Sequence, residues 1–217
     1  MDRNILNHCI LFKDLNDSEL AYALRFFNAQ ERSCRRGEQL NRPGEVMERF
    51  GLVLSGNVQV FMDDYGGNPL MMASVTPGIT FGESLCYLHK EAAVSVISVE
   101  ESSVLMMDTK SLDDPPVNPV AMDLRLTRRF TAMLADRALK MNDRIQILSK
   151  LTIREKVITL LSQYAVREGT SIITLPFNRE AMATYLGTNQ SALSRELSRM
   201  QEDGEIRFRG STFEILL

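Results

Sequence analysis

Residues 178–203 restrict the fold more than any other stretch, because they carry the pattern of two short helices joined by a tight turn. Met182 and Leu186 form the apolar side of the first helix, and Ala183 is small where a second helix would cross closely. Gly187 follows where the chain needs a left-handed backbone conformation to turn sharply. This order of a small residue, a glycine and a later apolar residue predicts a helix-turn-helix.

A hairpin is predicted directly after the second helix, because apolar and polar residues alternate over residues 204–215. Asn178 can cap the first helix, and Thr188 or Asn189 the second, since these side chains accept hydrogen bonds from free backbone N–H groups. A helix-turn-helix followed by such a hairpin is a winged helix, which indicates binding to double-stranded DNA.

One more helix is predicted ahead of this pair. Thr152 and Glu155 match a capping box, and apolar residues then recur with helical period until Gly169. Residues 172–175 follow as a short strand. We therefore expect residues 150–217 to form one winged helix-turn-helix domain.

The longest predicted helix lies in the middle of the chain. Asn118 can cap it ahead of Pro119, and residues 120–149 contain neither glycine nor proline. Its apolar residues step by three, four or seven, and arginines and lysines occupy the other faces, which is typical of a coiled coil. Packing against its own domain would also explain the stripe, but we expect a two-fold helix pair. The predicted dimer interface consists of Leu126, Phe130, Leu134, Met141, Ile145 and Leu148.

Between about residues 32 and 108 the sequence changes to short runs separated by turn-forming residues, among them Pro-Gly and Gly-Asn pairs. Val58, Val60 and Met62 alternate along one such run, which is the period-two signal of a strand. Many short strands at this spacing predict an all-β barrel or sandwich.

These patterns predict an α+β protein in three parts: a β domain over residues 1–115, a dimerisation helix over 116–149 and a winged helix-turn-helix over 150–217. The length of 217 residues suits two modest domains or one large one. Residues 150–217 have a net charge of +1 and residues 1–149 one of −4. The charge of the whole chain does not indicate a nucleic-acid-binding protein, but its C-terminal part is the one suited to approach phosphate.

Several function classes are disfavoured by what the sequence lacks. Cys9, Cys34 and Cys86 form neither a disulfide framework nor a metal-binding spacing, and two histidines cannot supply a histidine-rich metal site. No apolar run approaches the roughly 20 residues of a membrane span, and no secretory signal is recognised. We therefore expect a cytoplasmic protein without a metal or a membrane partner. An enzyme that uses Glu83 with His89 or Cys86 is also disfavoured, because no catalytic triad order or phosphate loop accompanies them.

Short motifs stand out along the β domain: Leu11-Phe12-Lys13-Asp14-Leu15, Arg36-Gly37-Glu38, Pro43-Gly44-Glu45, Gly51-Leu52-Val53-Leu54-Ser55-Gly56-Asn57-Val58, Pro77-Gly78 and Phe81-Gly82-Glu83. Together with the long helix and the winged helix, they resemble the Crp/Fnr superfamily of bacterial transcription regulators. The resemblance implies an N-terminal double-stranded β-helix (jelly roll) of the cyclic-nucleotide-binding type. It also implies a homodimeric, sequence-specific regulator that binds a palindromic site on double-stranded DNA and contacts RNA polymerase.

The resemblance also implies where an effector would bind. In cyclic-AMP-binding members a Gly-Glu pair on a short helix holds the cyclic phosphate and ribose, and an arginine ten residues after the glutamate neutralises the phosphate. Gly82 and Glu83 match the pair, but Ala93 stands at the position of the arginine. Because a buried phosphate without its arginine leaves a charge unpaired, we expect an effector other than cyclic AMP and a structural role for Glu83. The implied pocket consists of Gly82, Glu83, Ser84, Leu85, Ala93 and Met141.

The superfamily also contains sensors that carry an iron–sulfur cluster or haem. A cluster of that type needs four thiolates, which three cysteines in one chain cannot supply. Haem sensing of NO or CO stays open as the alternative, with His8, His89, Met71, Met72 and Met141 as candidate ligands. The methionines are also explained as flexible core filler. Thiol redox sensing is a further alternative, whereas a cyclic-nucleotide-binding module as in channels or kinases is disfavoured by the winged helix and the missing arginine.

The second helix of the helix-turn-helix is expected to enter the major groove with its N-terminal part. Relatives that read a TGTGA-type half-site use an Arg-Glu pair and a further arginine, and the matching positions here are Gln190, Ser191 and Arg195. Arg195 is the expected contact to guanine O6 and N7, and Gln190 can read an adenine, whereas Ser191 cannot replace the glutamate. The competing interpretation is that Arg195 pairs with a helix carboxylate such as Glu196. The predicted DNA-binding residues are Asn189, Gln190, Ser191, Ser194 and Arg195 at the bases, with Arg179, Thr188 and Arg199 at the phosphates.

Overall fold

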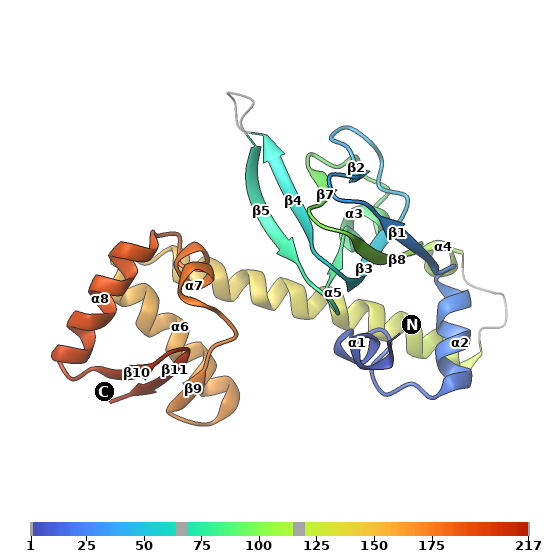
Figure 1. Cartoon of the computed structure of the whole chain (residues 1–217). Helices are drawn as coiled ribbons and strands as arrows, with labels where there is room; N and C mark the ends of the chain where they lie inside the picture. Colours follow the sequence, from blue (N-terminus) through green and yellow to red (C-terminus); the bar gives the residue numbers. More distant parts are fainter. Residues whose placement is uncertain (1, 64–68, 115–119, 217) are drawn as a thin grey trace. The chain divides into compact units, whose positions relative to one another are not determined.

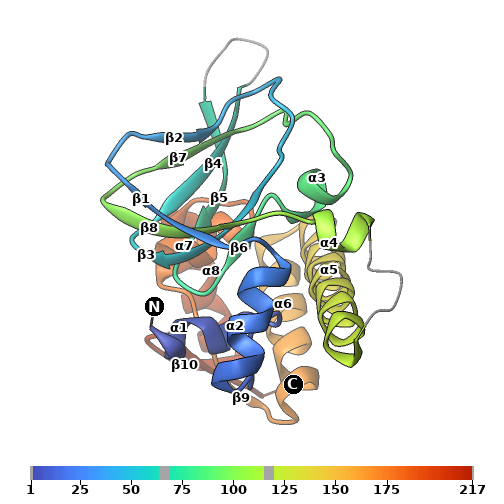
Figure 2. The same ribbon diagram turned by 90° about the vertical axis from the view of Figure 1, so that its right-hand side faces the viewer.

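The computed structural model describes residues 2–63, 69–114 and 120–216 (Figure 1, Figure 2). The chain forms two compact units, Met1–Ala135 and Asp136–Leu217, and the boundary between them falls inside the long helix α5 (Ala121–Leu148). The predicted cap of this helix, Asn118 with Pro119, lies outside the described residues.

The first unit is built around a β-roll of antiparallel strands. One four-stranded sheet has the order β1-β8-β3-β6 and the other the order β2-β7-β4-β5 (Figure 2). The strands are β1 (Gln30–Cys34), β2 (Gln39–Asn41), β3 (Phe50–Ser55), β4 (Val58–Asp63), β5 (Pro69–Val75), β6 (Thr80–Phe81), β7 (Ser95–Ser98) and β8 (Ser102–Met107). The prediction of an all-β domain of short strands is confirmed.

Short helices accompany the roll: α1 (Arg3–His8), α2 (Asp17–Phe26), α3 (Glu83–Tyr87) and α4 (Lys110–Asp113). Helix α2 lies against the start of α5, where the Tyr22 hydroxyl donates a hydrogen bond of 2.6 Å to the Asp123 carboxylate (Figure 1). The same carboxylate accepts from the backbone N–H of Val120 at 2.9 Å, so it caps the first turn of α5.

The first half of α5 belongs to the core of the first unit. Leu126 and Phe130 are 0% and 3% exposed, and the Phe130 ring lies 5.8 Å from that of Phe50 and 6.2 Å from that of Phe27. Such aromatic pairs add to the free energy gained by burying their apolar area. Neither Leu126 nor Phe130 is therefore available to a second chain, which corrects the predicted dimer interface. The sequence period revealed the apolar stripe but not which surface covers it.

The remaining residues of the stripe are more accessible. Leu134 is partly buried against the same core, whereas Met141, Ile145 and Leu148 are 60%, 61% and 41% exposed. Apolar side chains at this exposure on one helix are candidates for burial against another chain. In the part of the chain that the structure describes, no helix is both long and apolar enough to cross a membrane.

The second unit is a winged helix. It contains α6 (Ile153–Glu168), α7 (Arg179–Tyr185), α8 (Gln190–Glu202) and an antiparallel sheet in the order β10-β11-β9, made by β9 (Ile172–Thr174), β10 (Ile206–Arg209) and β11 (Thr212–Ile215). The predicted capping box of Thr152 and Glu155 starts α6, and Gly169 at φ +67° ends it. Helices α6 and α8 share a core to which Leu160 and Leu197 contribute side chains with no exposed surface. The α+β fold expected from the sequence is confirmed.

Candidate DNA-binding site and effector loop

The turn between α7 and α8 has the geometry of a helix-turn-helix. Asn178 accepts a hydrogen bond from the Ala181 N–H at 2.8 Å, and Gly187 has a left-handed φ of +63°. Of the two predicted caps of α8, Asn189 is the one observed, because its side chain accepts from the Ala192 N–H at 2.8 Å. Ala183 is 2% exposed at the contact between the two helices. Each local signal therefore acts at the position where the sequence placed it.

Helix α8 has a buried side and an exposed side. Leu193, Leu197 and Met200 are fully buried and hold the helix on the second unit. The residues predicted to face the bases lie on the exposed side or just ahead of it: Asn189, Gln190, Ser191, Ser194 and Arg195. The helix thus presents its N-terminal polar residues to solvent, as insertion into a major groove requires.

Arg195 is not neutralised by a neighbouring carboxylate. Its Nε donates to the backbone oxygen of Ser191 at 3.4 Å, and among the described residues it forms no ion pair. The competing interpretation paired Arg195 with the adjacent Glu196. Glu196 instead accepts a hydrogen bond from Arg154 at 2.9 Å and lies 3.8 Å from Arg199. The guanidinium of Arg195 therefore keeps donors that can contact a base.

The predicted phosphate contacts differ in how they are held. The side chain of Arg199 is 70% exposed, and Thr188 is partly buried in the turn. The Arg179 guanidinium lies 5.1 Å from the centre of the Phe208 ring and 5.5 Å from that of Phe213, and it donates to the Gly210 oxygen at 3.1 Å. Burial lowers the pKa of Arg179 from its usual value. Arg179 thus links α7 to the wing, a contact that the sequence did not indicate.

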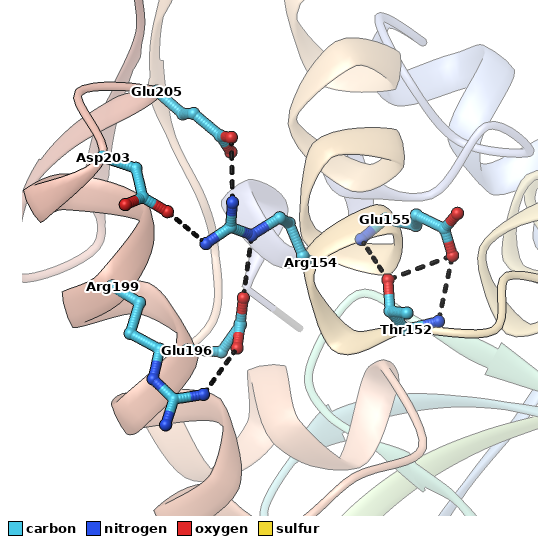
Figure 3. Close-up of polar contacts among 7 residues, drawn as sticks. All are labelled: Thr152, Arg154, Glu155, Glu196, Arg199, Asp203 and Glu205. Carbon is cyan, nitrogen blue, oxygen red and sulfur yellow. Dashed lines mark hydrogen bonds and ion pairs between the residues drawn. The ribbon is translucent and has the colours of Figure 1, made fainter.

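A second arginine of this unit, which the sequence did not indicate either, joins three carboxylates (Figure 3). Arg154 donates from Nε to Glu196 at 2.9 Å, from Nη1 to Glu205 at 3.0 Å and from Nη2 to Asp203 at 2.5 Å. These partners lie 42, 51 and 49 residues further along the chain, so no local pattern signals them. The hydrogen bonds to Glu196 and Asp203 raise the pKa of Arg154 above its usual range.

The candidate effector loop of the first unit contains Gly82 and Glu83. Gly82 caps α3 with a left-handed φ of +79°, and a Cβ atom there would fall 2.1 Å from the Met47 sulfur. Glu83 is 1% exposed, and its Oε1 accepts a hydrogen bond of 2.9 Å from the Thr80 hydroxyl. A carboxylate held inside the unit in this way supports the structure of the loop.

The other residues of the expected pocket differ in how far they are exposed to solvent. Ser84 and Ala93 are exposed, Leu85 is partly buried, and Met141 is an exposed residue of the second unit. The backbone beside Ala93 is fixed, because the Ala92 N–H donates to the Glu45 oxygen at 2.9 Å. Ala93 itself brings no charge to this loop.

Both candidate histidines have a polar partner and the thiols are buried, whereas the candidate haem ligands Met71, Met72 and Met141 are exposed. The Asn4 carbonyl oxygen accepts a hydrogen bond of 2.7 Å from the His8 Nδ1, and the His89 Nε2 lies 3.2 Å from the Asp113 carboxylate. All three cysteines are buried, and burial raises the pKa of the Cys9 thiol to about 11. Within the described ranges, no three His, Cys, Asp or Glu side chains gather as a metal site.

Two family models match the chain and account for both units. A cyclic nucleotide-binding domain matches residues 31–114, and a Crp-like helix-turn-helix domain matches residues 155–216. The chain belongs to the Crp/Fnr superfamily. The superfamily expected from the sequence motifs is thereby confirmed, and the comparisons support a DNA-binding transcription regulator of the Crp/Fnr type.

Relatives of this Crp/Fnr protein match it over most of its length. The cyclic AMP receptor protein of Thermus thermophilus is 26% identical over 208 residues, which cover 94% of this chain and 91% of the relative. The transcriptional activator protein FnrA of Stutzerimonas stutzeri is 26% identical and covers 85% of this chain and 76% of its own. The crystal structure of the Thermus thermophilus catabolite activator protein, 26% identical, superimposes with a TM-score of 0.53 over 95% of this chain and 93% of that chain.

Proposed function

We propose that this Crp/Fnr-type regulator is a homodimer that reads a palindromic DNA site and responds to an effector other than cyclic AMP. The observation that carries the DNA-reading part is the exposed N-terminal face of α8, on which Arg195 has no carboxylate partner among the described residues. Arg195 contacts a guanine through O6 and N7, and Gln190 reads an adenine in the same half-site.

The remaining predicted residues have distinct parts in this proposal. Asn189, Ser191 and Ser194 border the bases, and Thr188 and Arg199 contact phosphates on either side of them. Arg179 donates one N–H to the Gly210 oxygen, so it contacts phosphates only through its remaining N–H groups.

The dimer forms through the second half of α5. Met141, Ile145 and Leu148 recur there at intervals of four and three residues and are exposed, as are Leu139 and the small residue Ala138. This spacing suits a left-handed pair of helices related by a two-fold axis. A two-fold dimer presents two copies of α8, which is why the expected site is a palindrome.

The effector differs from that of the Thermus relative, which is named a cyclic AMP receptor protein. Residues 79–107 of this chain contain no arginine, and the loop glutamate Glu83 is already held by Thr80. A cyclic phosphate would therefore lack a bidentate partner on this loop. Haem and thiol sensing are less well supported than another small effector, since the described histidines have partners and the thiols are buried.

Selection of DNA from a randomised duplex pool tests the central part of the proposal. The full-length protein should enrich an inverted repeat whose two halves each contain a guanine. Enrichment of no sequence, or of a single unrepeated half-site, would contradict the proposed palindromic reading. On a promoter that carries the enriched site, we expect RNA polymerase to be the protein partner, which transcription in vitro with purified polymerase measures.

A further inference from the structure

The ion cluster around Arg154 joins α6 to two parts of the DNA-reading apparatus. Glu196 lies in the middle of α8, directly after Arg195, whereas Asp203 is the C-cap of that helix. Glu205 lies at the start of the wing, where the Leu216 N–H donates to its backbone oxygen. One side chain of α6 thus holds the helix at two points and the wing at a third (Figure 3).

The three contacts depend on the shape of a guanidinium. Arg154 uses Nε, Nη1 and Nη2, one for each carboxylate, at 2.9, 3.0 and 2.5 Å. A planar group with donors in fixed directions holds three partners in one arrangement, which the single ammonium of a lysine cannot do. The side chains of Arg154, Glu196 and Glu205 are 35%, 19% and 23% exposed, so their contacts are partly shielded from solvent and salt, whereas the Asp203 side chain is 51% exposed.

The direction of Arg195 depends on this arrangement. Glu196 is its neighbour in the sequence, so a rotation or shift of α8 at Glu196 moves Arg195 by the same amount relative to the rest of the domain. Bidentate contact with a base edge tolerates only small displacements, whereas attraction to phosphates tolerates large ones. A loss of positioning should thus reduce discrimination more than general affinity.

We propose that Arg154 is a positioning residue of the DNA-binding site, which fixes α8 and the wing so that Arg195 meets its guanine. The inference rests on the proposed function, because it requires a DNA sequence that the wild-type protein prefers. The proposal gives Arg154 no contact with DNA, because three of its donors are directed to carboxylates of its own domain.

Binding of Arg154→Gln and Arg154→Lys to two duplexes tests the proposal. The duplexes are the site that the wild-type protein enriches from a randomised pool and a scrambled sequence of the same composition. Discrimination is the Kd for the scrambled duplex divided by the Kd for the enriched site. This ratio of Kd values should fall about tenfold in Arg154→Gln, similar to the effect of one mismatched base pair, and by less in Arg154→Lys. The measurements are made at a temperature at which circular dichroism shows each variant to be folded.

Arg167→Gln is the matched control, because Arg167 lies on the same helix and its ion pair is with Asp143 at 3.1 Å rather than with α8 or the wing. This variant should keep the wild-type ratio. Equal losses of affinity on both duplexes in Arg154→Gln would overturn the proposal, since they would show that only the charge of Arg154 matters.

Glu196→Gln distinguishes the positioning effect from the charge effect, because here the two effects change DNA binding in opposite directions. Removal of a negative charge from α8 should raise affinity for the scrambled duplex, while the loss of one anchor lowers the ratio of Kd values. A ratio that stays constant or rises would overturn the positioning role. If the wild-type protein enriches no sequence at all, the proposed function fails, and this inference fails with it.

Discussion

Replacement of Arg195 by alanine tests the proposed base contact with little disturbance of the free protein. Arg195 is exposed, forms no ion pair among the described residues, and its hydrogen bond to the Ser191 oxygen is 3.4 Å long. A substitution at such a position changes the free energy of unfolding by less than about 0.5 kcal/mol. Any larger effect on DNA binding must therefore arise in the complex.

The expected loss follows from the kind of contact. A bidentate arginine–guanine pair contributes about 1–3 kcal/mol of discrimination, so the Kd of Arg195→Ala on the enriched site should rise about 5- to 150-fold. The Kd on scrambled DNA should rise much less, because only one of several cations near the phosphates is lost. Fluorescence anisotropy at one salt concentration measures both values.

Arg199→Ala provides the comparison, because Arg199 lies one turn further along α8 and is 70% exposed. As a phosphate contact, its loss should weaken binding to both duplexes equally and reduce the slope of log K against log salt by about 0.9. If Arg195→Ala behaves in this same way, with equal losses on both duplexes, the assignment of Arg195 to a guanine is refuted.

Three further outcomes follow from other parts of the structure. Ile145→Glu should give a monomer in analytical ultracentrifugation, because it would place like charges across the proposed two-fold axis, and a stable dimer would contradict that interface. Gly187→Ala should lower the free energy of unfolding by about 1–2 kcal/mol, measured by denaturant titration, because the residue has a φ of +63°. Millimolar cyclic AMP should leave the Tm unchanged, and a concentration-dependent rise would show that another cation replaces the missing arginine.

Much of the winged helix could be predicted from the sequence because its signals are local. The caps Asn178 and Asn189, the left-handed Gly187 and the capping box of Thr152 and Glu155 each act within a few residues. Their physical effect depends on the neighbouring backbone, so a short stretch of sequence contains the information.

The contacts that could not be predicted join segments far apart in the chain. The apolar period of α5 was correct, but Leu126 and Phe130 are covered by their own β-roll, and no periodicity states which surface covers a stripe. The sequence indicated no partner for Arg154 and only a phosphate contact for Arg179. Their observed contacts form only when α8 and the wing have packed.

The separation of the two sides of α8 has a consequence for how this regulator can change its target. The side chains of Gln190, Ser191 and Ser194 are exposed and contribute nothing to the hydrophobic core, whereas Leu193 and Leu197 hold the helix in place. Substitutions at the exposed positions should alter operator choice at almost no expense in folding. A library restricted to these three codons should therefore yield folded variants with altered operators, in keeping with the proposed reading of DNA by α8.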